Sequence, residues 1–118
     1  MIQETGLLLR IFIGEDDHFD GKPLYELIVL KAREQGVAGA TVLRGPMGFG
    51  HSSLIHTAKI LRLSEDLPVV VEIVDSKEKI TAFLPLLDGM VKGGLVTLEE
   101  IRVLRYGPSQ SQLGVLSG

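Results

Sequence analysis

The stretch Leu7-Leu8-Leu9-Arg10-Ile11-Phe12-Ile13 decides how the rest of this chain of 118 residues can fold. It is a run of aliphatic and β-branched residues, interrupted by one charge, and it ends at Gly14. Runs of this length and composition are typical of a strand that is buried inside a sheet. We therefore expect residues 7–13 to form a central strand, around which the other elements are arranged.

Three further stretches are predicted to be strands because they are short, rich in aliphatic and β-branched residues, and bounded by turn-forming residues. They are Ala40–Arg44, Val69–Val74 and Ile101–Tyr106. Residues 15–21 contain four acids and predict a solvated polar turn, since their spacing matches no calcium-binding loop. The apolar residues of 54–63 fit a short helix and an irregular strand equally well.

Two segments have apolar residues at helical spacing. In residues 23–35, Pro23 suits the first turn of a helix and Gly36 supplies a stop at its end. A second helix is expected to start near Ser76 and to end at Gly93-Gly94.

The second predicted helix has a capping-box-like start and a proline inside its pattern. Asp75 is the expected N-cap, because an acid, Glu78, follows three residues later. Pro85 is expected to kink or interrupt the helix at Leu84, because its ring displaces a backbone hydrogen bond.

The order strand, helix, strand, strand, helix, strand predicts an α+β protein with the ferredoxin-like split βαβ arrangement (βαββαβ). Right-handed crossovers would place both helices on one face of an antiparallel four-stranded sheet, in the spatial order fourth, first, third, second. Residues 1–106 would form a single domain, and 107–118, rich in Ser, Gln and Gly, a disordered tail.

The sheet face opposite the helices is predicted to carry a mixture of apolar and charged side chains. Arg10 would lie there between Glu72 and Arg102, among apolar neighbours. A surface of this kind is too apolar for water and too charged for a dry core, which is typical of a subunit interface. We expect another copy of the chain to cover this face, a monomer with a solvated sheet face being the alternative.

Composition narrows the class of partners. A net charge of −3 and only two Tyr, four Phe and no Trp argue against nucleic-acid binding, which needs a basic face and stacking aromatics. The absence of cysteine excludes disulfides and thiolate metal sites. Together with the lack of a signal-like leader and of a run long enough to span a membrane, it suggests a cytoplasmic protein.

The segment from Arg44 to Ser53 (RGPMGFGHSS) is the candidate functional loop. Gly45, Gly48 and Gly50, with Pro46 between them, cannot continue a strand or a helix. The flanking arginine, histidine and serines add donors that suit an anion. An ordinary connecting loop and an anion-binding loop both remain open at this point.

Enzymatic and metal-binding functions have weaker support. The chain has no Asn to orient a water for acyl-phosphate hydrolysis, and His51 stands where a Walker loop would require lysine. Ser52 or Ser53 beside His51 or His56 is the one candidate nucleophile pair, and neighbours in sequence seldom have the geometry for it. The histidines, His18 included, lack metal-ligand spacing. We therefore predict no catalytic residues and no metal site, while a small enzyme acting on a phosphorylated or nucleotide substrate stays an alternative.

Residues 7–106 resemble the bacterial and archaeal domain of unknown function numbered one hundred and ninety. The resemblance is carried by a set of short motifs: LRIFIGE (9–15), GKPLYE (21–26), GATVLRG (39–45), GFG (48–50), IHTAK (55–59) and LSEDLP (63–68). Members of that family are similar in fold to the PII signalling proteins and to the CutA-type trimers. The resemblance therefore implies a ferredoxin-like homotrimer, with a metal-binding CutA-like trimer as an alternative.

In PII proteins, adenine nucleotides bind in clefts between subunits, and a long loop after the second strand contacts the regulated partner. By resemblance, the chain would be a regulatory protein that senses a small anionic ligand, with an adenine nucleotide as candidate, and acts on a partner through residues 45–53. Some relatives are encoded beside CrcB-type proteins assigned as fluoride channels, so a membrane transporter, a channel or another regulated protein is the implied partner. The matching ligand-binding positions are Arg44, Gly45, Gly48, Gly50, Lys92, Gly93, Gly94, Thr97, Arg102 and Arg105.

Overall fold

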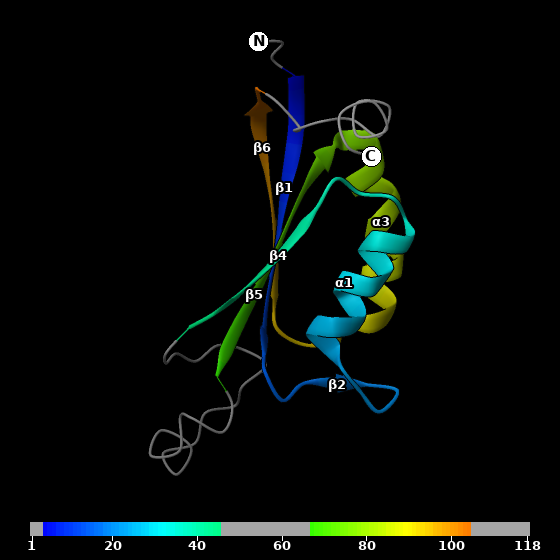
Figure 1. Ribbon diagram of the computed structural model, residues 1–118, viewed down its shortest axis with the longest axis vertical. Helices are drawn as coiled ribbons and strands as arrows, with labels where there is room; N and C mark the ends of the chain where they lie inside the picture. Colours follow the sequence, from blue (N-terminus) through cyan, green and yellow to red (C-terminus); the bar gives the residue numbers. More distant parts are fainter. Residues whose placement is uncertain (1–3, 46–66, 105–118) are drawn as a thin grey trace, which may run out of the picture.

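The computed structural model describes residues 4–45 and 67–104, which form an antiparallel four-stranded sheet with two helices on one face (Figure 1). The predictions for Gly48, Gly50, Arg105, residues 54–63 and the tail at 107–118 lie outside the described residues. The elements are β1 (Glu4–Gly14), β2 (His18–Phe19), β3 (Lys22–Pro23), α1 (Leu24–Glu34), β4 (Ala40–Arg44), β5 (Pro68–Ser76), α3 (Lys77–Met90) and β6 (Leu95–Val103).

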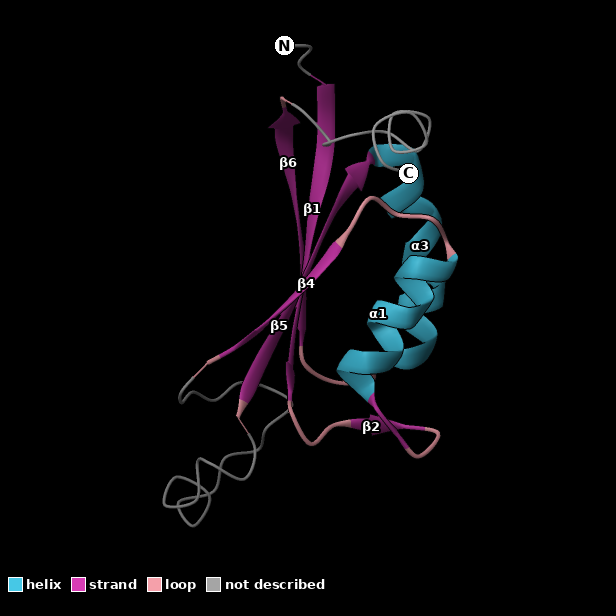
Figure 2. Cartoon of the chain, in the orientation of Figure 1, coloured by secondary structure: helices cyan, strands magenta, loops and turns pink. Residues whose placement is uncertain are grey.

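The strand order β4-β5-β1-β6 confirms the predicted ferredoxin-like topology, with the first strand in the centre of the sheet. Figure 2 shows α1 and α3 side by side on one side of the sheet, which we call the inner face; the opposite side is the outer face. Within residues 4–45 and 67–104, no helix is long and apolar enough to cross a membrane.

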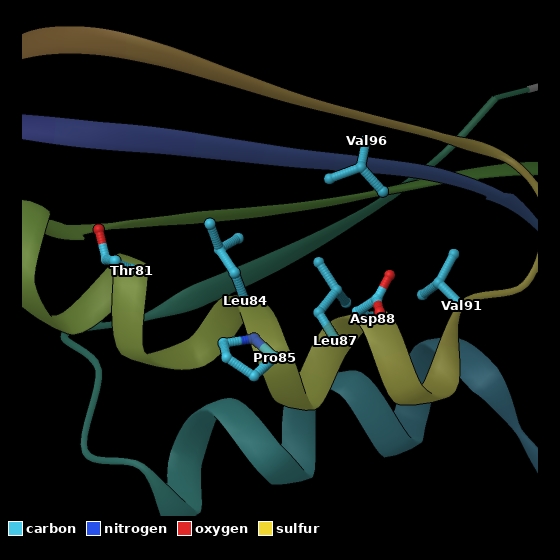
Figure 3. Close-up of a pocket in the computed structure, with 7 residues that line it drawn as sticks. All are labelled: Thr81, Leu84, Pro85, Leu87, Asp88, Val91 and Val96. Carbon is cyan, nitrogen blue, oxygen red and sulfur yellow. The ribbon is translucent and has the colours of Figure 1, made fainter.

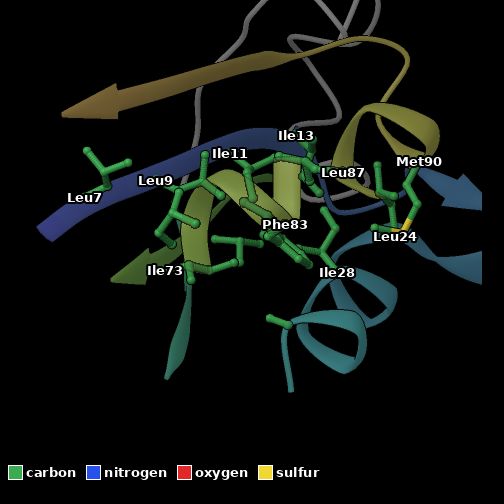
Figure 4. Packing of buried hydrophobic residues seen from close by; sticks show 14 residues of the cluster. Leu7, Leu9, Ile11, Ile13, Leu24, Ile28, Ile73, Phe83, Leu87 and Met90 are labelled. Atoms are coloured by element: carbon green, nitrogen blue, oxygen red, sulfur yellow. The ribbon is translucent and has the colours of Figure 1, made fainter. Parts of the chain in front are cut away.

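The hydrophobic core lies between the inner face and the two helices (Figure 4). Every second residue of β1 and β5 points into it, as the pleat of a strand requires. Ile28 and Phe83, from α1 and α3, are fully buried against these strands. The alternating residues of the two strands that contribute to the core are Leu7, Leu9, Ile11, Ile13, Val69, Val71 and Ile73.

A small hairpin stands where we expected only a polar turn. β2 and β3 pair through His18 opposite Pro23 and Phe19 opposite Lys22. The two residues between them, Asp20 and Gly21, have φ of 54° and 76°. An Asp-Gly pair with positive φ at both positions is the favoured two-residue hairpin turn, so the sequence signal was present and overlooked.

The start of α3 corrects the predicted cap. Ser76 is the N-cap, and its hydroxyl accepts a hydrogen bond from the backbone N–H of Lys79 at 3.2 Å. Asp75 is instead buried and accepts from the backbone N–H of Ala38 at 2.6 Å and of Ser76 at 2.7 Å. The helix continues through Pro85 without interruption.

The last strand also differs from its prediction, because β6 begins at Leu95 rather than at Ile101 and so includes Thr97. Its register places Thr97 opposite Arg10, and Arg102 opposite Thr5. Paired residues share a face, so Arg102 belongs to the inner face and does not flank Arg10. This part of the prediction was wrong.

Arg10 lies on the outer face, as predicted, and is paired with carboxylates on both neighbouring strands. Its Nε is 2.9 Å from Glu72 Oε2 on β5, and its Nη1 is 3.4 Å from Glu99 Oε1 on β6. The hydrogen bond to Glu72 is the main cause that raises the pKa of Arg10 above its ordinary value. The expected mixture of charged and apolar side chains is present, since exposed Phe12, Leu43 and Leu95 share this face.

Candidate functional site

The candidate site lies at the end of the sheet where β1 and β4 end and where β5 and β6 begin, the lower end in Figure 1. Arg44 is opposite Val69, which is in turn opposite Ile13, so the end of β4 is level with the end of β1. Leu95, at the start of β6, is opposite Phe12 at this same end.

Arg44 is the centre of a cluster of three side chains from separate elements. Its Nε donates to Glu15 Oε2 at 2.6 Å, and its Nη2 donates to the hydroxyl of Tyr25 at 2.8 Å. The guanidinium carbon lies 5.1 Å from the centroid of the Tyr25 ring, within range of a cation–π interaction. Glu15 follows β1, Tyr25 lies in the first turn of α1 and Arg44 ends β4, so the fold brings together residues far apart in sequence.

Electrostatics keep this arginine charged. The hydrogen bond to Glu15 is the main cause that raises the pKa of Arg44 above its ordinary value, with Tyr25 contributing in the same direction. The Arg44 side chain is 46% exposed, whereas that of Glu15 is 28% exposed. The guanidinium therefore offers a permanent positive charge to solvent while one of its edges is held by a carboxylate.

Two backbone hydrogen bonds hold Gly45 and Leu67, the described residues on either side of segment 46–66, at this end of the sheet; we call this pair of residues the mouth of the segment. The N–H of Gly45 donates to the carbonyl of Pro68 at 2.8 Å, which extends the β4–β5 ladder by one residue. The N–H of Glu15 donates to the carbonyl of Leu67 at 2.8 Å. Gly45 is thus bonded to β5, and Leu67 is bonded to Glu15, the residue that follows β1.

The other predicted positions lie at the start of β6. Lys92 and Gly93 are exposed between α3 and β6, and Thr97 is half-buried on the outer face. Gly94 has φ of 84°, and a Cβ at this position would overlap with the carbonyl oxygen of Phe12. The backbone itself thus requires glycine at position 94, whatever ligand role this residue has.

Within one chain, these two groups of residues are separate. β4 and β6 are opposite edges of the sheet, three strand spacings or about 14 Å apart. Arg102 is seven residues along β6 from Leu95, roughly 23 Å toward the other end of the sheet. Arg44 and Gly45 therefore lie at the candidate-site end of one edge strand. Gly94 and Thr97 lie at the same end of the sheet but at its other edge, and Arg102 is distant from both pairs of residues.

Two hollows are present elsewhere on the described surface. One, of about 550 Å³, lies between α3 and β6 and is lined mainly by apolar residues, among them Leu84, Val91 and Val96 (Figure 3). The other, of about 360 Å³, lies on the outer face and contains Glu72, which Arg10 already neutralises. Neither contains a cation suited to an anionic ligand. Residues 4–45 and 67–104 also contain no group of three or more His, Asp or Glu that could hold a metal ion.

The family model described as "Uncharacterized ACR", the domain of unknown function DUF190, matches residues 6–103. The chain belongs to the DUF190 family. A UPF0166 protein of Aquifex aeolicus is 46% identical over 97 residues, which cover 82% of this chain and 91% of the relative. A UPF0166 protein of Methanocaldococcus jannaschii is 35% identical over 99 residues, covering 83% and 91%. The resemblance stated above is thereby confirmed.

Solved structures give the fold of this DUF190 chain. A protein of Thermus thermophilus assigned to the PII-like signalling proteins superposes with a TM-score of 0.62 at 17% identity, covering 89% of this chain and 95% of that one. CPII of Thiomonas intermedia, solved with ADP, AMP and acetate, superposes with a TM-score of 0.56 at 19% identity, covering 89% and 94%. The fold is therefore PII-like.

Sequence reasoning missed Glu15 and Tyr25 as partners of Arg44. Both stood in the motifs that carry the family resemblance, but nothing in their spacing linked them to residue 44. Glu15 was one of four acids in a polar segment, and only the antiparallel register shows that this acid is level with the end of β4.

Proposed function

We propose that this chain is a PII-like signalling protein that binds a small anionic ligand, and that an adenine nucleotide is that ligand. The observation that carries the proposal is the charged Arg44 side chain, which is 46% exposed and whose guanidinium lies over the Tyr25 ring at the mouth of segment 46–66. A planar guanidinium can donate two parallel hydrogen bonds to phosphate oxygens. The structural neighbour CPII, solved with ADP and AMP, supports the nucleotide as ligand.

We further propose that the binding cleft is completed by a second copy of the chain. Arg44 and Gly45 lie on one edge of the sheet, and Lys92 to Thr97 lie on the other. A cleft between two subunits would bring one edge of each together, and it is also the arrangement in which Arg102 could approach Arg44. Gly48, Gly50 and Arg105 would add to the same cleft, and the expected assembly is a homotrimer.

The outer face supports assembly. It carries an ion pair between Arg10 and Glu72 whose side chains are 38% and 30% exposed, and exposed Phe12, Leu43 and Leu95 form a row across the sheet beside this pair. Exposed apolar and aromatic side chains beside an arginine are typical of subunit interfaces, in which aromatic residues and Arg are enriched. We propose that the regulated partner, a transporter, a channel or another protein, contacts residues 45–53 of the assembled protein.

The test is a titration of the protein with AMP, ADP, ATP and cyclic AMP, followed by thermal unfolding, because a ligand that binds the native state raises its stability. We compare the wild type with Arg44→Gln and with Arg33→Gln, which removes the same charge from an exposed position on α1. The wild type and Arg33→Gln should show a saturable upward shift with one nucleotide, and Arg44→Gln should not. An equal shift in Arg44→Gln would show that Arg44 does not contact the nucleotide. The absence of a shift with all four nucleotides would show that adenine nucleotides are not the ligand.

A further inference from the structure

We infer that Glu15 occupies, in the ligand-free chain, the place that the anion of the ligand takes, so that binding is an exchange of one anion for another at Arg44. The inference rests on the proposed function, because it concerns the site already described. It gives Glu15 the role of selecting ligands by their charge, a role that neither the sequence motifs nor the fold assigned to this residue.

The geometry fixes the guanidinium while leaving the carboxylate replaceable. Tyr25 holds Arg44 twice, through the hydroxyl at 2.8 Å from Nη2 and through the ring face at 5.1 Å from the guanidinium carbon. Glu15 is bonded to the Nε edge alone, at 2.6 Å. Its backbone is tied to Leu67, so an exchange requires only rotation of its side chain.

Glu15 thereby sets which anions can bind. A singly charged carboxylate or bicarbonate would replace one charge-assisted hydrogen bond by an equal one, with no net gain. A phosphate group carries up to two charges and three acceptor oxygens. The Tyr25 hydroxyl accepts a hydrogen bond from Arg44 and still has its own hydrogen to donate. A phosphate can therefore accept hydrogen bonds from both Arg44 Nε and the Tyr25 hydroxyl. The site therefore selects phosphate-bearing ligands over monocarboxylates.

The decisive variant is Glu15→Gln, which keeps the size of the side chain and removes its charge. The matched control is Glu26→Gln, the same change at an exposed position in the first turn of α1. Binding of ATP, of tripolyphosphate and of acetate is measured by calorimetry at constant ionic strength. We expect Glu15→Gln to bind ATP and tripolyphosphate about tenfold more tightly than the wild type, since a competing charged acceptor has been removed. Acetate binding should become measurable only in Glu15→Gln, and Glu26→Gln should match the wild type.

If the wild type binds ATP and Glu15→Gln binds it equally or more weakly, the exchange is overturned while the proposed function stands. If none of the three proteins binds ATP or tripolyphosphate, both are overturned. Binding of ATP without tripolyphosphate would also overturn the exchange, because the phosphates would then not be what Arg44 recognises.

A ligand-free measurement keeps the two ideas distinguishable. Hydrogen exchange of the Arg44 Nε–H, followed by nuclear magnetic resonance, should be faster in Glu15→Gln than in the wild type and in Glu26→Gln. Equal rates in all three proteins would show that Glu15 does not occupy the site in solution, and would overturn the inference whatever the calorimetry shows.

Discussion

At the scale of single residues, Gly94 shows how a backbone requirement and a binding role can be confused in a sequence. By resemblance to PII proteins, Gly93 and Gly94 are expected among the ligand-binding positions. In the structure, position 94 has φ of 84° and lies against the carbonyl of Phe12, which by itself explains the glycine. A ligand role at this position stays a prediction and needs evidence that is independent of stability.

Gly94→Ala should lower the free energy of unfolding by about 3 kcal/mol, because a side chain is strained at positive φ and its Cβ would meet the Phe12 carbonyl. Urea denaturation measures this change. Gly89→Ala is the control: a Cβ there meets nothing within 4 Å, and Ala in a helix should stabilise the protein by about 0.5–1 kcal/mol. Equal stability of Gly94→Ala and the wild type would contradict the geometry at this turn.

At the scale of elements, hydrophobic pattern predicted what lies in the core and failed where charge and apolar residues mix. The strands at 7–13 and 69–74 were found from their runs of aliphatic and β-branched residues, and the helix at 23–35 from its helical spacing, because both patterns mark elements that are packed into the core. β6 was misplaced because it runs along the edge of the sheet. Leu98 and Glu100 both lie on its inner face and are exposed, so the sequence of β6 shows no regular alternation of apolar and polar residues that would mark where the strand starts.

The cap of α3 offers a test at this scale. Ser76→Ala should cost about 1 kcal/mol of unfolding free energy, because the backbone N–H of Lys79 loses its acceptor. Ser76→Asp should retain most of the stability, since a carboxylate is an equally good cap. Were Asp75 the true cap, as the sequence pattern suggested, Ser76→Ala would have almost no effect in thermal or urea unfolding.

At the scale of the whole molecule, topology followed from the order of elements, but the site did not. Short connections and right-handed crossovers leave few arrangements for this order, and the observed one was among them. The cluster of Glu15, Tyr25 and Arg44 depends on the register between strands that are far apart in sequence, which a single sequence does not specify. The mixed character of the outer face was predicted correctly for Arg10 and Glu72, because alternation along β1 and β5 places them there, and wrongly for Arg102 on β6.

Assembly through the outer face leads to a prediction at this scale. Phe12→Asp should reduce the mass of the native species in sedimentation equilibrium, since the new charge would lie beside exposed apolar residues of the outer face. Leu30→Asp introduces the same charge at an exposed position on α1 and should leave the mass unchanged. A monomer in the wild type at micromolar concentration would rule out assembly of the free protein, and an oligomer that survives Phe12→Asp would place the interface elsewhere.

The two backbone hydrogen bonds at the mouth of segment 46–66 also bear on how sequences of this kind can diverge. Because Gly45 and Leu67 are each fixed by a bond to a neighbouring element, the sheet does not depend on how many residues connect them. Doubling the length of a flexible connection costs only about 0.6 kcal/mol of closure entropy. Insertions, deletions and grafted sequences between these two residues should therefore accumulate at little cost to folding.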